Sequence, residues 1–203
     1  MGKVETTYQG ETVNFISLNG KVKQNGTNII VGDGGALYQA NKLEMNAERE
    51  RDYYRTVEGK KMISSRTKTP KKYGIISSGN VTFMTKDSTL VGATIVSPNV
   101  SCLVDGDFRF LPAYVDQHNW AYESHSNFFG SSSVSFSQDR RIPVGCQILA
   151  GEFNFLGAGT LEMEGVVAKI VNATITKNIE ERAAYETSHT VITQSASGFC
   201  PPK

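Results

Sequence analysis

The sequence predicts an all-β protein, and the prediction rests on recurring strand patterns, abundant glycine and the regular spacing of certain glycines. A glycine followed by alternating apolar residues begins the segments GNVTF (79–83), GDFRF (106–110) and GEFNF (151–155). Such alternation puts apolar side chains on one face of a strand and polar side chains on the other. The 19 glycines among 203 residues suit a chain with many tight corners.

The spacing of these glycines indicates how the strands are arranged. Glycines at positions 79, 106, 130 and 151 lie 27, 24 and 21 residues apart. We therefore expect residues 1–203 to form a single β-rich domain with a β-solenoid (β-helix) fold, in which each coil buries its inner face against its neighbours. Strands at regular spacing also occur in a β-sandwich or jelly roll, which is the alternative fold.

One segment departs from the strand pattern. Residues 36–62 are rich in helix formers, and Leu37, Ala40, Leu43 and Ala47 make a partial apolar stripe at helical spacing. From Lys60 to Lys72 the chain is basic and contains no acid. We expect a charged helical or loop excursion over residues 42–72, either solvated or acting as an arm that meets an acidic partner.

The C-terminal region is expected to contain a short helical turn at residues 180–185 and an edge strand at 189–197. Residues 196–203, which end in Cys-Pro-Pro-Lys, are expected to form a flexible tail.

Charge and cysteine content limit the classes of partner. The net charge of +1 gives no overall field that would attract nucleic acid, so we do not expect a nucleic-acid partner. Cys102, Cys146 and Cys200 form no CxxC pair, and we expect reduced thiols, with one bridge as the alternative. The polar N-terminus does not read as a signal peptide, and no apolar run reaches the roughly 18 residues of a membrane span. Localisation stays open, and a virion or cell surface is compatible with the sequence.

The segment YVDQHNWAYESHSNFF (114–129) is the candidate binding site, and we expect it to be a long loop. Aromatic rings can stack on sugars while neighbouring polar groups bond to the hydroxyls, so a carbohydrate or a protein is the expected ligand. In the alternative, the aromatic side chains only hold the loop to the β body. His118 and His125 match no metal-binding spacing, and neither metal nor cofactor is predicted. The candidate binding residues are Tyr114, Asp116, His118, Trp120, Tyr122, Glu123 and His125.

Support for catalysis is weaker. Asp105 and Asp107 would point to the same face of a strand and could act as acid and base in polysaccharide cleavage. Two carboxylates beside a corner glycine are more typical of a turn, so no catalytic residue is assigned. The sequence therefore favours a protein that is not an enzyme.

Two segments resemble known families. GNVTFMTKDSTLVGATIV (79–96) resembles the strand-turn-strand unit of polymer-forming β-solenoids such as bactofilins, and it is also similar to repeats of the periplasmic β-jellyroll proteins that carry lipopolysaccharide. GKVKQNGTNIIV (20–31) is a looser match. The resemblance covers at most a fifth of the chain, and it implies strand architecture and polymer formation without assigning roles to single residues.

Taken with the strand pattern, this indicates a structural or assembly protein that self-associates, such as a filament, spike, fibre or virion component with a surface-contact loop. The alternatives are an enzyme acting on polysaccharide from a β-helix scaffold and a periplasmic lipid carrier.

Overall fold

The computed structural model describes residues 6–127, 130–176 and 178–198. All regular secondary structure in these ranges is β, which confirms the all-β prediction. No helix in the described part is long and apolar enough to cross a membrane. The chain divides into two compact units. Unit 1 comprises Met1–Glu48, Pro70–Ala113 and Pro143–Ala184, and unit 2 comprises Arg49–Thr69, Tyr114–Ile142 and Tyr185–Lys203.

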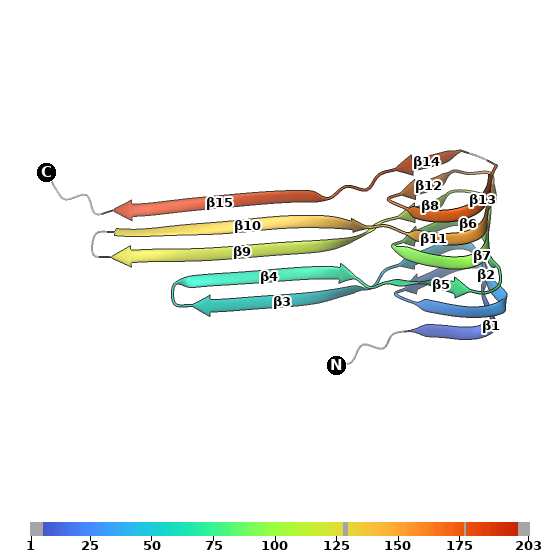
Figure 1. Cartoon of the computed structure of the whole chain (residues 1–203), viewed down its shortest axis with the longest axis horizontal. Coiled ribbons are helices and arrows are strands. Elements are labelled where there is room, and N and C mark those ends of the chain that lie inside the picture. Colours follow the sequence, from blue (N-terminus) through green and yellow to red (C-terminus); the bar gives the residue numbers. More distant parts are fainter. Residues whose placement is uncertain (1–5, 128–129, 177, 199–203) are drawn as a thin grey trace. The chain divides into compact units, whose positions relative to one another are not determined.

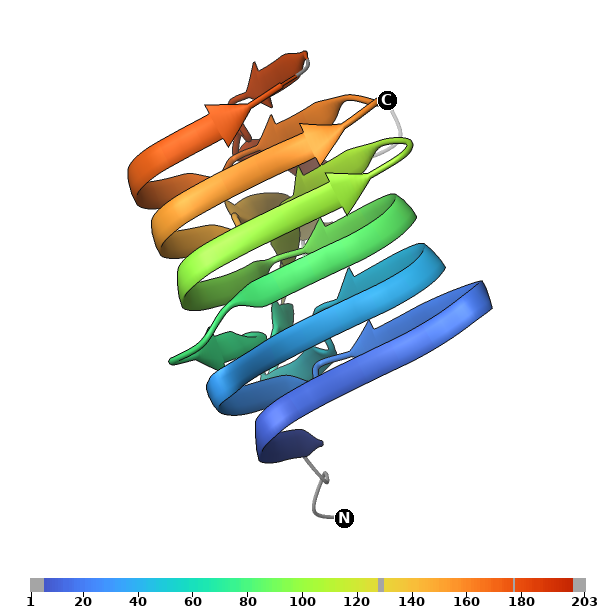
Figure 2. The ribbon, with the colours of Figure 1, turned by 90° about the vertical axis from the view of Figure 1, so that its right-hand side faces the viewer.

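Unit 1 is built from successive coils, each a turn of chain that lies parallel to the next. Ile75 lies beside Ile95 and Val81 beside Val100, so partners are 20 and 19 positions apart. Figure 2 shows these turns stacked one on another, from β1 in blue to β13 in orange-red. The six coils of the described residues are coil 1, β1 (Thr7–Asn25); coil 2, β2 (Asn28–Asn46); coil 3, β5 (Tyr73–Ser77) and β6 (Val81–Val91); coil 4, β7 (Ala93–Val104) and β8 (Phe108–Leu111); coil 5, β11 (Gln147–Gly157) and β12 (Leu161–Glu164); and coil 6, β13 (Val167–Ile175) and β14 (Ile179–Arg182).

The pairing between coils is parallel throughout the described strands of unit 1, which differs from the antiparallel pairing of a sandwich or jelly roll. β2 pairs with β5 along its first part and with β6 along its second, because coil 3 is interrupted at a corner. Each coil therefore meets its neighbour along most of its length.

In-register pairing sorts the inward side chains into columns. Ile29, Ile75, Ile95 and Ile148 form one column, and each is at most 1% exposed. A second column begins with Phe15, Tyr38 and Phe83, whose ring centroids follow one another at 5.0 and 5.2 Å. Burying such side chains contributes about 1.5–3 kcal/mol each, so the columns are the main source of stability in unit 1.

Polar groups inside the stack are bonded. The Tyr73 hydroxyl lies 2.8 Å from the carbonyl oxygen of Met45 and 2.9 Å from that of Val91, so it links three coil segments. Burial raises the pKa of this hydroxyl far above its ordinary value. Cys102 and Cys146 are free, buried thiols, and burial raises the pKa of Cys146 to about 11. Cys200 lies outside the described residues.

The same glycine corner occurs three times, once in every second coil. Gly26, Gly92 and Gly165 have φ near +60°, and an added Cβ on each would lie 2.7 Å from the Cβ of the residue one coil later. Their amides donate to carbonyl oxygens of the next coil at 2.8, 2.9 and 2.8 Å, namely those of Asn46, Leu111 and Arg182. At the intervening corners the chain leaves unit 1, after Glu48, Ala113 and Ala184. Two coils and one exit thus form a structural repeat.

Unit 2 consists of the segments that leave at these exits. They form one antiparallel sheet in the order β15-β10-β9-β4-β3, seen as long arrows of alternating direction in Figure 1. The strands are β3 (Arg49–Glu58), β4 (Lys61–Pro70), β9 (Ala113–Asn127), β10 (Gly130–Val144) and β15 (Thr187–Gly198).

The structure corrects the expected excursion and C-terminal turn. Residues 42–46 belong to β2, and 49–70 form the β3–β4 hairpin, so the segment 42–72 is neither helix nor irregular loop. Residues 179–182 are strand β14 instead of a helical turn. β15 covers the expected edge strand and lies at the sheet edge. Residues 196–198 of the expected tail belong to β15, and 199–203 lie outside the described residues.

The corner glycines give a first prediction. Gly92→Ala should destabilise unit 1 by about 3 kcal/mol, because a left-handed φ costs a residue with a Cβ about 1 kcal/mol and the contact with Ala113 adds about 2. Gly59→Ala is the matched control, because Gly59 has φ of +59° with open space around its added Cβ. Denaturant unfolding should give the control a loss of only about 1 kcal/mol. Equal losses would contradict the corner contact.

Candidate functional site

The expected binding loop is a strand. Residues 113–127 form β9 in the middle of the unit 2 sheet, and 128–129 lie outside the described residues. The physical reason lies in the alternation of the segment itself. Tyr114, Trp120 and Tyr122 occupy even positions, with smaller or polar residues at most odd ones, and such alternation fits a strand.

Because side chains of a strand alternate, the candidate residues separate onto two faces. Tyr114, Asp116, His118, Trp120 and Tyr122 share one face of the sheet, here named the aromatic face. Glu123 and His125 lie on the opposite face, here named the reverse face, where the Nε2 atom of His125 lies 3.2 Å from Oε1 of Glu123.

The two histidines considered as metal ligands are therefore on opposite faces. His118 belongs to the aromatic face and His125 to the reverse face. In the described ranges, no group of three or more His, Cys, Asp or Glu residues has the geometry of a metal site.

Neighbouring strands add residues that sequence reasoning did not assign. In the β4–β9 register, Arg66 lies opposite His118 and Lys68 opposite Asp116. In the β10–β15 register, Asp139 lies opposite His189. The alternation of Arg66-Thr-Lys68 was a visible signal that both cations point the same way, but only the sheet register places them beside β9.

The carboxylates of the aromatic face are held by cations. Asp116 Oδ2 lies 3.0 Å from Nη1 of Arg49, and Asp116 Oδ1 lies 3.5 Å from Nε of Arg141. The Arg141 guanidinium also lies 3.8 Å from the centre of the Tyr114 ring. These contacts fix the Arg141 side chain between a carboxylate and an aromatic ring.

His118 and Asp139 form a second polar contact on this face. The Nδ1 atom of His118 lies 2.7 Å from Oδ1 of Asp139. The contact orients the imidazole ring.

These side chains line an open groove of about 580 Å³, a volume typical of ligand sites. Its lining includes Arg66, Lys68, Asp116, His118, Arg141 and His189. On the same face, the rings of Trp120 and Tyr122 are parallel to within 4°, with centroids 6.0 Å apart. The arrangement offers flat apolar surface beside a charged groove, which suits binding.

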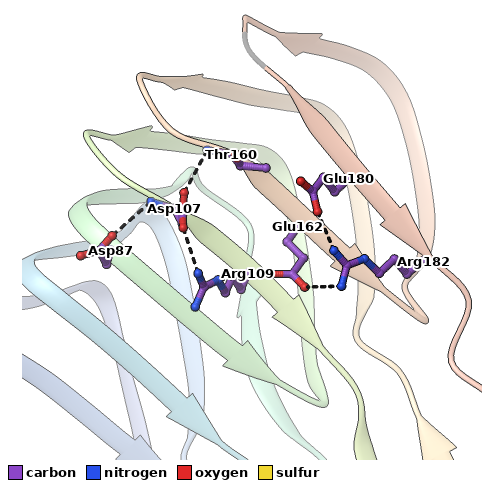
Figure 3. A network of polar contacts seen from close by, with 7 residues as sticks. All are labelled: Asp87, Asp107, Arg109, Thr160, Glu162, Glu180 and Arg182. Atoms are coloured by element: carbon purple, nitrogen blue, oxygen red, sulfur yellow. Dashed lines mark hydrogen bonds and ion pairs between the residues drawn. The ribbon is translucent and has the colours of Figure 1, made fainter.

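Of the two carboxylates weighed for catalysis, that of Asp107 bonds at a coil corner. The amide of Asp107 donates to Oδ1 of Asp87 at 3.1 Å, and Oδ1 of Asp107 accepts from the amide of Thr160 at 3.2 Å. Figure 3 shows this chain of contacts running from one coil to the next. Such bonds are the turn chemistry expected of an Asp beside a corner glycine.

No family model, no curated protein and no solved structure matches the chain. The resemblance of residues 79–96 to bactofilin-type repeats therefore stays a prediction.

The position of Trp120 gives a stability prediction. Its side chain lies half-buried on a single-layer sheet, so Trp120→Ala should destabilise the protein by about 1 kcal/mol, the worth of one aromatic pair. Phe83→Ala, which empties a fully buried position, should cost about 3–5 kcal/mol. Denaturant unfolding of both variants distinguishes a surface ring from a ring that anchors a core. A loss as large as that of Phe83→Ala would contradict the surface role.

Proposed function

We propose that the protein is a non-enzymatic assembly protein whose unit 1 is a β-solenoid that stacks end to end with further copies. The observation that carries the proposal is the state of the two end coils. Coil 1 pairs only with coil 2, and coil 6 only with coil 5, among the described strands. Each therefore offers a row of backbone groups to another strand.

The inner positions of the end coils are less covered than the same positions inside the stack. Tyr8 is 45% exposed and Ile179 is 40% exposed, whereas Ile29 and Leu43 are fully buried. A further coil placed on either end would cover these side chains, as coils 2 to 5 are covered.

The ends are also complementary in register. The strand pairings can be followed from coil 1 to coil 6. They place Val22 and Ile179 in one column, and Lys23 and Glu180 in the neighbouring column. If coil 1 of a second copy lay on coil 6 in this register, an apolar pair and an opposite-charge pair would meet at the junction. Both would extend the columns inside one copy.

The charged column already uses such pairs within the chain. Glu44 lies next to Lys23 in this column, and its carboxylate lies 2.5 Å from Nζ of Lys21, whose hydrogen bond lowers the pKa of Glu44. Higher in the column, Nε of Arg109 lies 3.2 Å from Oε2 of Glu162. Arg182 continues the series between Glu162 and Glu180 (Figure 3). A junction of Lys23 with Glu180 would repeat this motif.

End-to-end stacking joins two different surfaces, and a contact of this kind produces open chains unless rotation closes a ring. This supports the filament or fibre role over a compact oligomer. The filled interior of unit 1, with its isoleucine and aromatic columns, speaks against the lipid-carrier alternative. The corner bonds of Asp107 speak against its use in polysaccharide cleavage.

Charge reversal tests the junction. Lys23→Glu and Glu180→Lys should each lower the association constant about tenfold at low salt, because each puts like charges across the junction. An equimolar mixture of the two variants should recover association, since every mixed junction then has opposite charges. Sedimentation velocity across a range of protein concentrations measures all three samples.

Lys86→Glu is the matched control, because Lys86 is an exposed lysine of coil 3, away from both ends. It should assemble like the parent protein. A monomer at every concentration of the parent protein would overturn the stacking proposal, and a mixture as weak as either variant would overturn the proposed register.

A further inference from the structure

The aromatic face of unit 2 collects positive charge from the edge strand β3. Arg49 reaches this face, because it contacts Asp116. Arg55 also lies on this face, because its Nη2 atom lies 3.5 Å from Sδ of Met62. Met62 pairs with Tyr122, which fixes the side of the sheet. By alternation Arg51 points the same way, while Glu50 and Asp52 point to the reverse face. The arginines of β3 therefore lie on the aromatic face, and its acidic residues lie on the reverse face.

The groove adds cations that are not neutralised within the described chain. No carboxylate of the described residues lies within ion-pair distance of Arg66 or Lys68. Arg66 and Lys68 lie two positions apart on β4, about 6.6 Å along the strand. Positive groups therefore repeat along the groove at the spacing of alternate strand residues.

The groove is not uniformly positive, and this bears on the class of ligand. Asp116 and Asp139 lie among the cations and would repel a continuous row of phosphates. Carboxylate oxygens do accept hydrogen bonds from sugar hydroxyls, and the parallel Trp120 and Tyr122 rings offer flat surface to the apolar faces of sugar rings. Cations, hydroxyl acceptors and flat rings together match a sugar chain that bears negative groups.

We propose that the aromatic face binds an acidic polysaccharide, whose carboxylate or sulfate groups contact Arg66, Lys68 and Arg141 while its sugar rings lie on Trp120 and Tyr122. The inference goes beyond the proposed assembly function by naming a ligand class for unit 2. It does not depend on the stacking of unit 1, because every residue involved belongs to unit 2.

Trp120 provides the measurement, since it is the only tryptophan of the chain and lies on the proposed face. Its fluorescence is titrated with polygalacturonate, dextran sulfate, neutral dextran and a single-stranded oligo-dT. We expect saturable binding of at least one acidic polysaccharide and none of neutral dextran. The first two probes distinguish carboxylate from sulfate recognition.

The double variant Arg66→Gln with Lys68→Gln should weaken binding about tenfold or more, as judged by the same titration. Lys61→Gln is the matched control, because Lys61 lies on the same strand but pairs with Glu123 of the reverse face. It should bind like the parent. Circular dichroism of both variants checks that the sheet is intact, and the exposed or half-buried positions of these side chains make that the expected result.

Four outcomes would overturn the inference: no binding of either acidic polysaccharide, equal binding of neutral dextran, tighter binding of oligo-dT than of both acidic polysaccharides, or equal losses in the double variant and the control. Repeating the titration in the Lys23→Glu background keeps the two proposals apart. This variant is expected to lose stacking and to keep polysaccharide binding. A parent protein that binds the polysaccharide without stacking would count against the stacking alone, and a parent protein that stacks without binding would count against the ligand alone.

Discussion

The in-register parallel pairing of coils is the constraint on which the rest of unit 1 depends. Because each backbone segment bonds to the same segment of the next coil, every inward position becomes a column that runs through the stack. A column accepts side chains only if each fits those before and after it, as the run of Ile29, Ile75, Ile95 and Ile148 illustrates. The outward positions obey the same register, which makes an ion-pair series out of residues far apart in sequence.

Turned corners and exits alternate along the part of the chain that forms unit 1. Strands pair about 4.8 Å apart whether they belong to stacked coils or to an antiparallel sheet. A hairpin contributes two strands to unit 2, and two coils contribute two strand spacings to unit 1. Unit 2 gains one hairpin after coil 2 and another after coil 4, and Gly26, Gly92 and Gly165 make the turns between exits.

The strands could be predicted from the sequence, but their order in the sheets could not. The spacings of 27, 24 and 21 residues were counted over four glycines that do not occupy equivalent places. Gly79, Gly106 and Gly151 lie in the coils of unit 1, whereas Gly130 begins the hairpin strand β10 of unit 2. The helical stripe in residues 36–47 came from a corner, where Asn41 and Lys42 both point outward and shift the inward positions from even to odd numbers. Leu43 then falls three residues after Ala40, as it would in a helix.

The candidate site was predictable in part for a related reason. The five residues on the aromatic face were identified because they crowd one short segment of sequence. Glu123 and His125 were included by proximity along the chain, although alternation sends them to the other face. Arg66, Lys68 and His189 could not be added, because only pairing between strands far apart in sequence places Arg66 and Lys68 beside β9 and His189 beside β10.

The edge strands show which surfaces are built to avoid pairing. Six of the ten residues of β3 are charged, and they alternate in sign along its first half, which is a pattern that discourages another strand from adding there. β13, an edge of unit 1, carries a single charge, Lys169, in nine residues. Protection at β3 and its absence at β13 are expected if copies join through the end coils of unit 1, because stacking needs those end edges open and is harmed by strand pairing at an edge of unit 2. The charges of β3 then serve two purposes, since the arginines that protect the edge also supply the aromatic face.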